Sequence, residues 1–128
     1  MNDELPELER FARGELDPAN FPHREHLRMA FEMLRRHDFA ETAYHYSFAL
    51  RRMTARAGRP EAFHQTMTIA FLSLIAERML SGGAVDFAAF AEANPELMDK
   101  SAVARRYGPE RLRMDAARST FLLPDLAR

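Results

Sequence analysis

The stretch "IAFLSLIA", residues 69–76, decides the fold class, because it is the longest apolar run in the chain. It lies within a segment, about 61–80, whose apolar side chains cover more than half of a helical circumference. The run is too short to cross a bilayer, so we expect it in the central helix of a soluble protein without a membrane partner. The side chains that define this helix are Met67, Phe71, Leu72, Leu74, Ile75 and Met79.

Helical periodicity continues on both sides of this segment, and the alternation typical of strands is nearly absent. We therefore predict an all-α fold, a single-domain bundle of four to five helices over residues 1–128 with an extended C-terminal tail, "TFLLPDLAR". The expected helical segments are about 22–36, 39–57 and 61–80, followed by shorter ones near 86–93, 94–107 and 110–118.

The first of these segments, 22–36, gathers its charged residues on one side of the helical wheel. Glu25 with Arg28, and Glu32 with Arg35, have the spacing at which opposite charges meet on a helix surface. We expect this side of the helix to be solvated.

The residue composition limits the cellular setting. With Cys 0, the chain has neither a disulfide framework nor a thiolate metal site, which is compatible with a cytoplasmic location. The first twenty residues, "MNDELPELERFARGELDPAN", are acidic and polar, whereas a secretory signal needs a basic start and an apolar run. We expect a cytoplasmic protein.

The charge balance argues against nucleic acid as a partner. Lys+Arg 18 against Asp+Glu 19 gives a formal net charge of -1, which attracts neither nucleic acid nor anionic lipid. All the basic residues except Lys100 are arginines, and several crowd into 51–59 and 105–118. These arginines either solvate the surface or recognise an anion through their forked guanidinium groups.

Three histidines are expected at one end of the bundle. In "FPHREHLRMAF", residues 21–31, both His23 and His26 fall on the apolar stripe of the first helix, and His64 falls on that of the 61–80 helix. Short loops make neighbouring helices antiparallel, so the first and third helices start at the same end. The three imidazoles should then point inward at one level.

This arrangement predicts a mononuclear metal site with His23, His26 and His64 as ligands. The ion would be a divalent transition metal, with zinc or iron favoured over copper or nickel. Three protein ligands leave a position open, as in catalytic sites, and Asp99, Tyr107 and Asp115 are candidates for a fourth ligand. The alternative is that the histidines are core groups that form hydrogen bonds within the protein.

A small-molecule substrate, an anion, would be held beside this site. Arg118 is the expected carboxylate or phosphate ligand, Tyr107 would border the pocket, and Thr68 lies one turn beyond His64 on the same side of the helix. Each choice has an ordinary alternative. Arg118 has the spacing to pair with Asp115 on the surface, and a threonine such as Thr68 often bonds back to its own helix.

Four short motifs carry a family resemblance. "FPHREHLRMA", "FHQTMT", "YGPERL" and "ARSTFLLPD" resemble the motifs of a family of small, all-helical bacterial proteins with no established activity, and the resemblance covers about four-fifths of the chain. It implies a helical fold and a bacterial source but no reaction. Phe63 stands where that family often has tyrosine, and Gly108 where it often has serine.

The rival hypothesis is a non-catalytic helical interaction or scaffold protein with structural core histidines. It is motivated by the absence of an inward carboxylate that could form an acid/base pair with the histidines. Such a protein would form a homodimer or bind a partner through exposed apolar residues of the tail, namely Phe121, Leu122 and Leu123. The sequence names no reaction, so it leaves open whether the protein is an enzyme.

Overall fold

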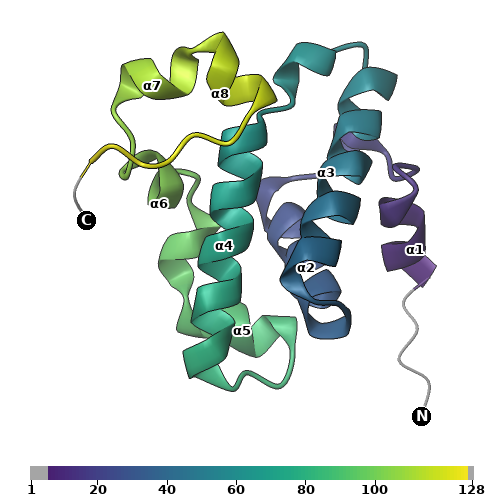
Figure 1. Cartoon of the computed structure of the whole chain (residues 1–128). Coiled ribbons are helices and arrows are strands. Elements are labelled where there is room, and N and C mark those ends of the chain that lie inside the picture. The colour runs from purple at the N-terminus through teal and green to yellow at the C-terminus, as the bar shows by residue number, and fades with distance from the viewer. Residues whose placement is uncertain (1–5, 127–128) are drawn as a thin grey trace. The chain divides into compact units, whose positions relative to one another are not determined.

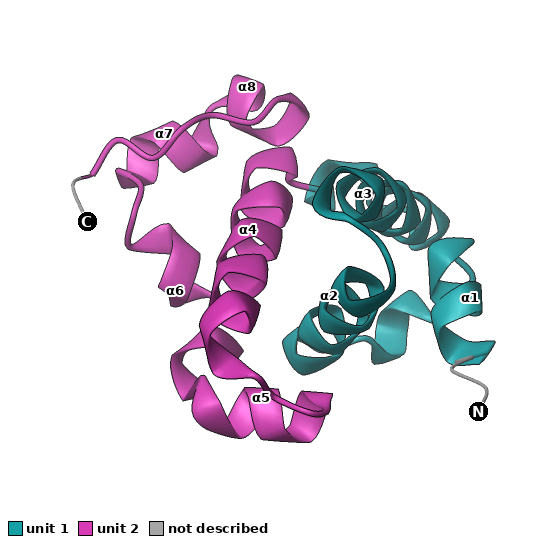
Figure 2. Ribbon diagram, turned by 60° about the horizontal axis from the view of Figure 1, so that its bottom comes forward, with its two compact units in different colours: residues 1–63 teal, residues 64–128 magenta. Residues whose placement is uncertain are grey.

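The computed structural model describes residues 6–126, and within that range all regular structure is helical, with no strand (Figure 1). The all-α fold class is therefore confirmed. The chain divides into two compact units, residues 1–63 and residues 64–128, coloured separately in Figure 2. The single helical domain expected over residues 1–128 stays a prediction.

Unit 1 is built around two long helices that follow each other in the sequence, α2 (His23–Arg36) and α3 (Phe39–Arg56). These two helices contact each other. Both lie within one residue of the expected bounds. A short helix, α1 (Pro6–Ala12), contacts both of them and buries Leu8 and Phe11. The helix α1 was not predicted from the sequence. A single pair of apolar residues in an acidic segment is too short to show helical periodicity. Two 3-10 turns, Pro18–Asn20 and Pro60–Ala62, complete the unit.

Polar contacts tie α1 and the link that follows it to the long helices. Arg28 of α2 bonds to Glu7 at 2.5 Å and to Glu25 at 2.9 Å, which confirms the expected Glu25–Arg28 pair. Arg56 of α3 donates from Nη1 to the carbonyl oxygens of Gly14 at 2.7 Å and Leu16 at 3.2 Å. The link between α1 and α2 is thus fixed by the far end of α3.

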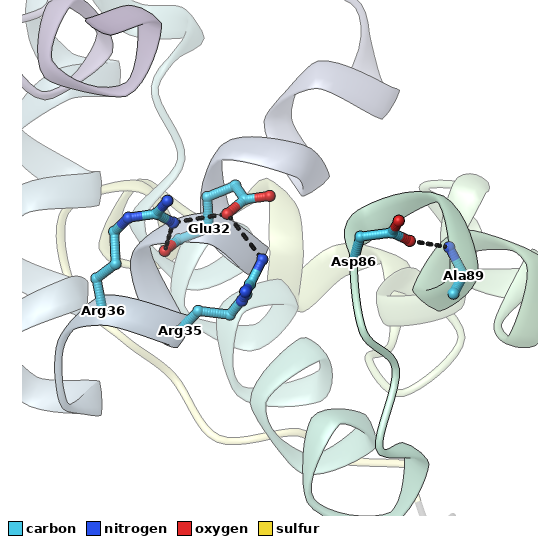
Figure 3. Close-up of polar contacts among 5 residues, drawn as sticks. All are labelled: Glu32, Arg35, Arg36, Asp86 and Ala89. Atoms are coloured by element: carbon cyan, nitrogen blue, oxygen red, sulfur yellow. Dashed lines mark hydrogen bonds and ion pairs between the residues drawn. The ribbon is translucent and has the colours of Figure 1, made fainter. Parts of the chain in front are cut away.

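Glu32 corrects the expectation of a wholly solvated charged face on α2. Its side chain accepts from Arg36 at 2.6 Å and from Arg35 at 3.4 Å (Figure 3), so the Glu32–Arg35 pair is confirmed. The residue itself is only 8 % exposed. A carboxylate this deeply buried is tolerated because two guanidinium groups of its own helix offset the loss of hydration.

Unit 2 is organised around α4 (Gln65–Gly82), which contacts α5 (Phe87–Ala93), α6 (Ser101–Ala104) and α8 (Asp115–Ser119). Its buried residues include Phe71, Leu72, Leu74 and Ile75, as expected for the central helix. Gly83 ends α4 with a φ of 66°, a left-handed conformation that glycine adopts without strain. Asp86 then begins α5 by accepting from the Ala89 N–H at 2.9 Å (Figure 3).

No single helix within residues 6–126 is long and apolar enough to span a membrane. Taken together, α4 and α5 are long and apolar enough for a membrane span. However, the chain bends by 94° at the break between these two helices.

Three of the helices predicted in this part of the sequence differ from those in the structure. The helix expected from residue 61 begins at Gln65, because Phe63 and His64 are in extended conformations. The segment 94–107 is not one helix but a 3-10 turn, Pro95–Met98, followed by α6. The segment 110–118 is split into α7 (Pro109–Arg113) and α8 by the extended backbone of Met114.

The tail is extended over residues 120–126, as the sequence predicted, and this segment is called the C-terminal strap below; the last two residues of the predicted tail, 127 and 128, lie outside the described residues. Among the described residues, hydrogen bonds join the strap to the rest of unit 2. Four of them join backbone groups of the strap to the side chains of Thr66, Tyr107 and Arg111. Three others join the Gly108 N–H to the Asp125 carboxylate, the Leu126 N–H to Arg106 O and the Thr120 N–H to Ala116 O.

Candidate functional site

The first two predicted ligands, His23 and His26, lie on the first turn of α2 with their ring centroids 6.4 Å apart. Both are half-buried. The ring of Phe21 lies 4.5 Å from that of His26 and stacks at 5.4 Å on Phe11, so an aromatic surface borders this turn. The buried Tyr46 hydroxyl donates to the His26 carbonyl at 3.0 Å. Burial raises the pKa of Tyr46, which keeps this phenol protonated as a donor.

The third predicted ligand, His64, is in unit 2 and stands one residue before α4 rather than on the apolar stripe inside a helix. Its Nδ1 accepts from the Met67 N–H at 3.1 Å, which caps the helix. Its Nε2 lies 2.8 Å from the Leu112 carbonyl oxygen, to which it donates. The ring is therefore a neutral Nε2–H tautomer that joins the start of α4 to the end of α7.

These bonds test whether the donor atoms fit a metal ion. A metal at His64 would have to displace either the Met67 N–H or the Leu112 carbonyl, since both ring nitrogens already have protein partners. Within residues 6–126, no group of three or more His, Cys, Asp or Glu side chains is placed to hold a metal ion. As placed, the donors do not fit a three-histidine centre, and the set of His23, His26 and His64 stays a prediction.

Tyr107, expected at the border of a substrate pocket, instead holds the C-terminal strap. It is buried, and its hydroxyl donates to the Leu122 carbonyl at 2.8 Å. Burial is the main reason that the pKa of Tyr107 is raised. The hydroxyl is thus a structural donor on the inner side of the strap.

The sequence reading missed Thr66, which lies at the centre of the same contact. This fully buried residue donates to the Thr120 carbonyl at 2.7 Å and accepts from the Leu122 N–H at 3.1 Å. A helix continuing back to residue 61 would place Thr66 and His64 on opposite sides of the wheel. Because the helix starts at Gln65, both residues serve its first turn. The feature of the sequence that could have indicated the role of Thr66 is its position two residues after His64 in "HQTMT".

The other proposed substrate ligands, Thr68 and Arg118, are not among the residues that line the cavity described below. Thr68 donates to the His64 carbonyl at 2.7 Å, which is the bond back to its own helix that was weighed as the alternative. Arg118 is exposed in the last turn of α8. Among the candidate fourth ligands, Asp115 is exposed in the first turn of α8, and the Asp99 carboxylate accepts from the Ser101 N–H at 3.0 Å.

A shallow cavity of about 560 Å³ lies beside the strap. Two of its walls are built by strap contacts: Arg111 Nε donates to the Leu123 carbonyl at 2.8 Å, and the Gly108 N–H donates to Asp125 at 2.8 Å. A Cβ atom at Gly108 would lie 3.2 Å from an Asp125 carboxylate oxygen, so glycine suits this close approach. The lining residues are Gly108, Pro109, Glu110, Arg111, Met114 and Asp125.

Residues 64–68 of "FHQTMT" therefore meet residues of "YGPERL" and "ARSTFLLPD" within unit 2, where several of them fix the strap. The resemblance to a family of small bacterial helical proteins stays a prediction. Comparisons of the chain with models of protein families, with curated proteins and with solved structures found no match.

Proposed function

We propose that the protein is a non-catalytic binding module whose C-terminal strap receives a partner protein. One observation carries this proposal: the polar atoms of His64, Thr66 and Tyr107 are directed at the chain's own backbone. A general base or nucleophile needs a polar atom within reach of a substrate. Here those atoms hold a segment of chain in place.

The strap combines a fixed backbone with exposed apolar side chains. Phe121 is 38 % exposed and Leu123 is 67 % exposed, and residues two apart in an extended chain point to the same side. Leu122 between them is half-buried, as expected for the opposite side. Because the backbone is already held by hydrogen bonds, a partner would lose little free energy in ordering it.

The chemistry around the strap indicates the kind of partner. Arg113 and Arg118 are exposed on α7 and α8, the helices that lead into the strap. Exposed apolar residues that follow these arginines in the sequence fit an apolar segment of another protein flanked by acidic residues. Arginine is common among the residues that dominate binding energy at interfaces, and phenylalanine is enriched at interface cores.

The test replaces Phe121 and Leu123 by serine in the full chain. Truncation would be uninformative, because it would also remove the bonding partners of Thr66 and Tyr107. Peptides that combine apolar and acidic residues, selected from a random display library on the wild type, should lose at least tenfold in affinity for the double variant. Isothermal titration calorimetry measures the change.

The matched control replaces Leu80 and Val85, two exposed apolar residues of the same unit, by serine. This control should keep wild-type affinity. Selected peptides that bind the wild type and the Phe121/Leu123 variant equally would contradict the proposal, as would a selection that yields no specific peptide.

A metal site at His23 and His26 is the second candidate function, favoured by the placement of both rings on one helical turn. Rotation of the two rings would let one nitrogen of each approach the same divalent ion, whether zinc, iron, copper or nickel. Other ligands would come from water or a bound small molecule. His64 would complete the set expected from the sequence only by giving up a bond that it makes within unit 2.

His26→Ala is expected to abolish stoichiometric zinc binding by this pair, whereas His64→Ala should leave it intact. Elemental analysis and calorimetric titration of protein without a histidine tag measure both. His64→Ala should instead lower the free energy of unfolding by about 1–2 kcal/mol, because it removes a helix cap. His45→Ala, at a half-buried histidine of α3, is the control. Equal zinc content in the wild type and His26→Ala would exclude the pair as a metal site.

A further inference from the structure

The outer face of α3 carries an exposed row of residues that we call the α3 seam. Its members lie alternately three and four residues apart, the spacing with which two helices pack along a common line. The two aromatic members are unusually open, Tyr44 at 68 % and Phe48 at 43 % exposure. The α3 seam consists of Glu41, Tyr44, Phe48, Arg51 and Ala55, all of them exposed.

The opposite face of the same helix forms the core of unit 1, with Thr42, Tyr46, Ala49, Leu50 and Met53 buried. The fold of unit 1 therefore accounts for the apolar residues on the buried face of α3. It does not account for the large rings on the exposed face. Solvated helix faces usually carry charged residues rather than a pair of large rings. Tyr44 and Phe48 lie about one turn apart, and the Arg52 guanidinium is 5.7 Å from the centroid of the Phe48 ring, so together they form a candidate interaction surface.

Charge changes sign along the α3 seam. Glu41 lies in the first turn of α3, the rings follow, and Arg51 lies near the other end. The Arg51 guanidinium is 5.4 Å from the centroid of the Phe63 ring, which supports it at the surface of unit 1. A partner that complements this order must present a basic end, then apolar rings, then an acidic end.

We propose that this partner is a second copy of the chain, with the two α3 seams packed antiparallel about a two-fold axis. Glu41 and Arg51 lie equally far from residue 46, and so do Tyr44 and Phe48. An axis at residue 46 therefore places Tyr44 opposite Phe48 of the second copy and Glu41 opposite Arg51 of the second copy. Two-fold symmetry makes each contact twice.

The parallel arrangement is disfavoured by the same residues. It would place Glu41 against Glu41 and Arg51 against Arg51, and like charges facing each other across an interface are repulsive. The antiparallel arrangement also pairs the aromatic rings, which adds about 0.5–1.5 kcal/mol per pair beyond the burial of their surface.

The size of the contact sets its strength. An 18-residue helix is about 27 Å long. A single pair of helices of this length buries less surface than the roughly 1,200–2,000 Å² typical of stable complexes. The dimer should therefore form reversibly and depend on protein concentration and salt.

Sedimentation velocity on the full chain over a concentration series tests the proposal. Glu41→Arg and Arg51→Glu should each raise the dimer dissociation constant at least tenfold, because each creates two repulsive pairs. The double variant Glu41→Arg/Arg51→Glu exchanges the charges and should restore dimerisation to within threefold of the wild type. Replacing Tyr44 and Phe48 together by serine should abolish dimerisation.

The matched control is Glu92→Arg with Arg105→Glu, at two exposed positions of unit 2, and it should dimerise like the wild type. Circular dichroism melts confirm that each variant is folded. A wild type that is monomeric up to millimolar concentration overturns the proposal, and so does a double variant no better than the single ones. The Phe121/Leu123 variant should dimerise normally, which separates this interface from the strap.

Discussion

Thr66→Val is expected to lower the free energy of unfolding by about 2–4 kcal/mol, although it changes the volume of the side chain very little. The threonine hydroxyl serves two backbone groups of the strap, the Thr120 carbonyl and the Leu122 N–H. Valine leaves both without this partner at a fully buried position. A buried polar group left unsatisfied costs about 1–3 kcal/mol, and these two bonds are part-buried, so each is expected to cost about 1–2 kcal/mol. Urea denaturation measures the total effect.

Hydrogen exchange should locate the effect in the strap. The Leu122 amide should exchange much faster in Thr66→Val than in the wild type, because its acceptor is gone. Ser73→Ala on the same helix is the control: its exposed hydroxyl bonds back to the Ile69 carbonyl at 2.9 Å, so its loss should cost under about 0.5 kcal/mol. A Thr66→Val effect as small as that of the control would show that the strap is not held through this hydroxyl.

Gly14→Ala should destabilise unit 1 by about 2–4 kcal/mol. Gly14 has a φ of 71°, a left-handed conformation that costs a residue with a Cβ atom about 1–2 kcal/mol. The added Cβ would also lie 2.5 Å from the Arg52 Cβ and 3.3 Å from the Ala49 carbonyl oxygen. Because the Gly14 carbonyl accepts from Arg56, the backbone cannot move away without weakening that bond.

Gly58→Ala separates the two causes. Gly58 has a similar φ of 76°, but a Cβ there would meet nothing within 4 Å. This control should therefore show only the backbone cost of about 1–2 kcal/mol. Thermal and urea denaturation compare the two variants, and equal losses would mean that the contact with Arg52 contributes nothing.

The parts of the fold that the sequence predicted well are those set by local signals. The bounds of α2 and α3 follow from long apolar stripes and from breakers such as Gly58, and α5 follows from Asp86 as its cap. The helix predicted to start after Asn94 was wrong, because the Asn94 side chain does not cap a helix. This side chain donates to the Phe90 carbonyl at the end of α5, which is a local bond, and accepts from Arg78 of α4, a contact that depends on tertiary structure.

The candidate site shows how a small boundary error changes a chemical interpretation. Starting the third helix at residue 61 turned His64 into an inward ligand on an apolar stripe, whereas the actual start at Gln65 makes it a cap. The same error hid Thr66. The contacts from His64 to Leu112 and from Thr66 to Thr120 join residues 48 and 54 apart, and no local pattern specifies them.

The strap also determines the order in which the protein can mature on the ribosome. Thr66 bonds to residues 54 and 56 positions later, so the start of α4 lacks these partners until the strap has been translated and has left the exit tunnel. At about 5–20 residues per second, the 65 residues of unit 2 take about 3–13 s to synthesise. During that interval unit 1 can finish folding while the apolar core helix of unit 2 is still exposed. The start of α4 is therefore the part of unit 2 that waits longest for its hydrogen-bond partners.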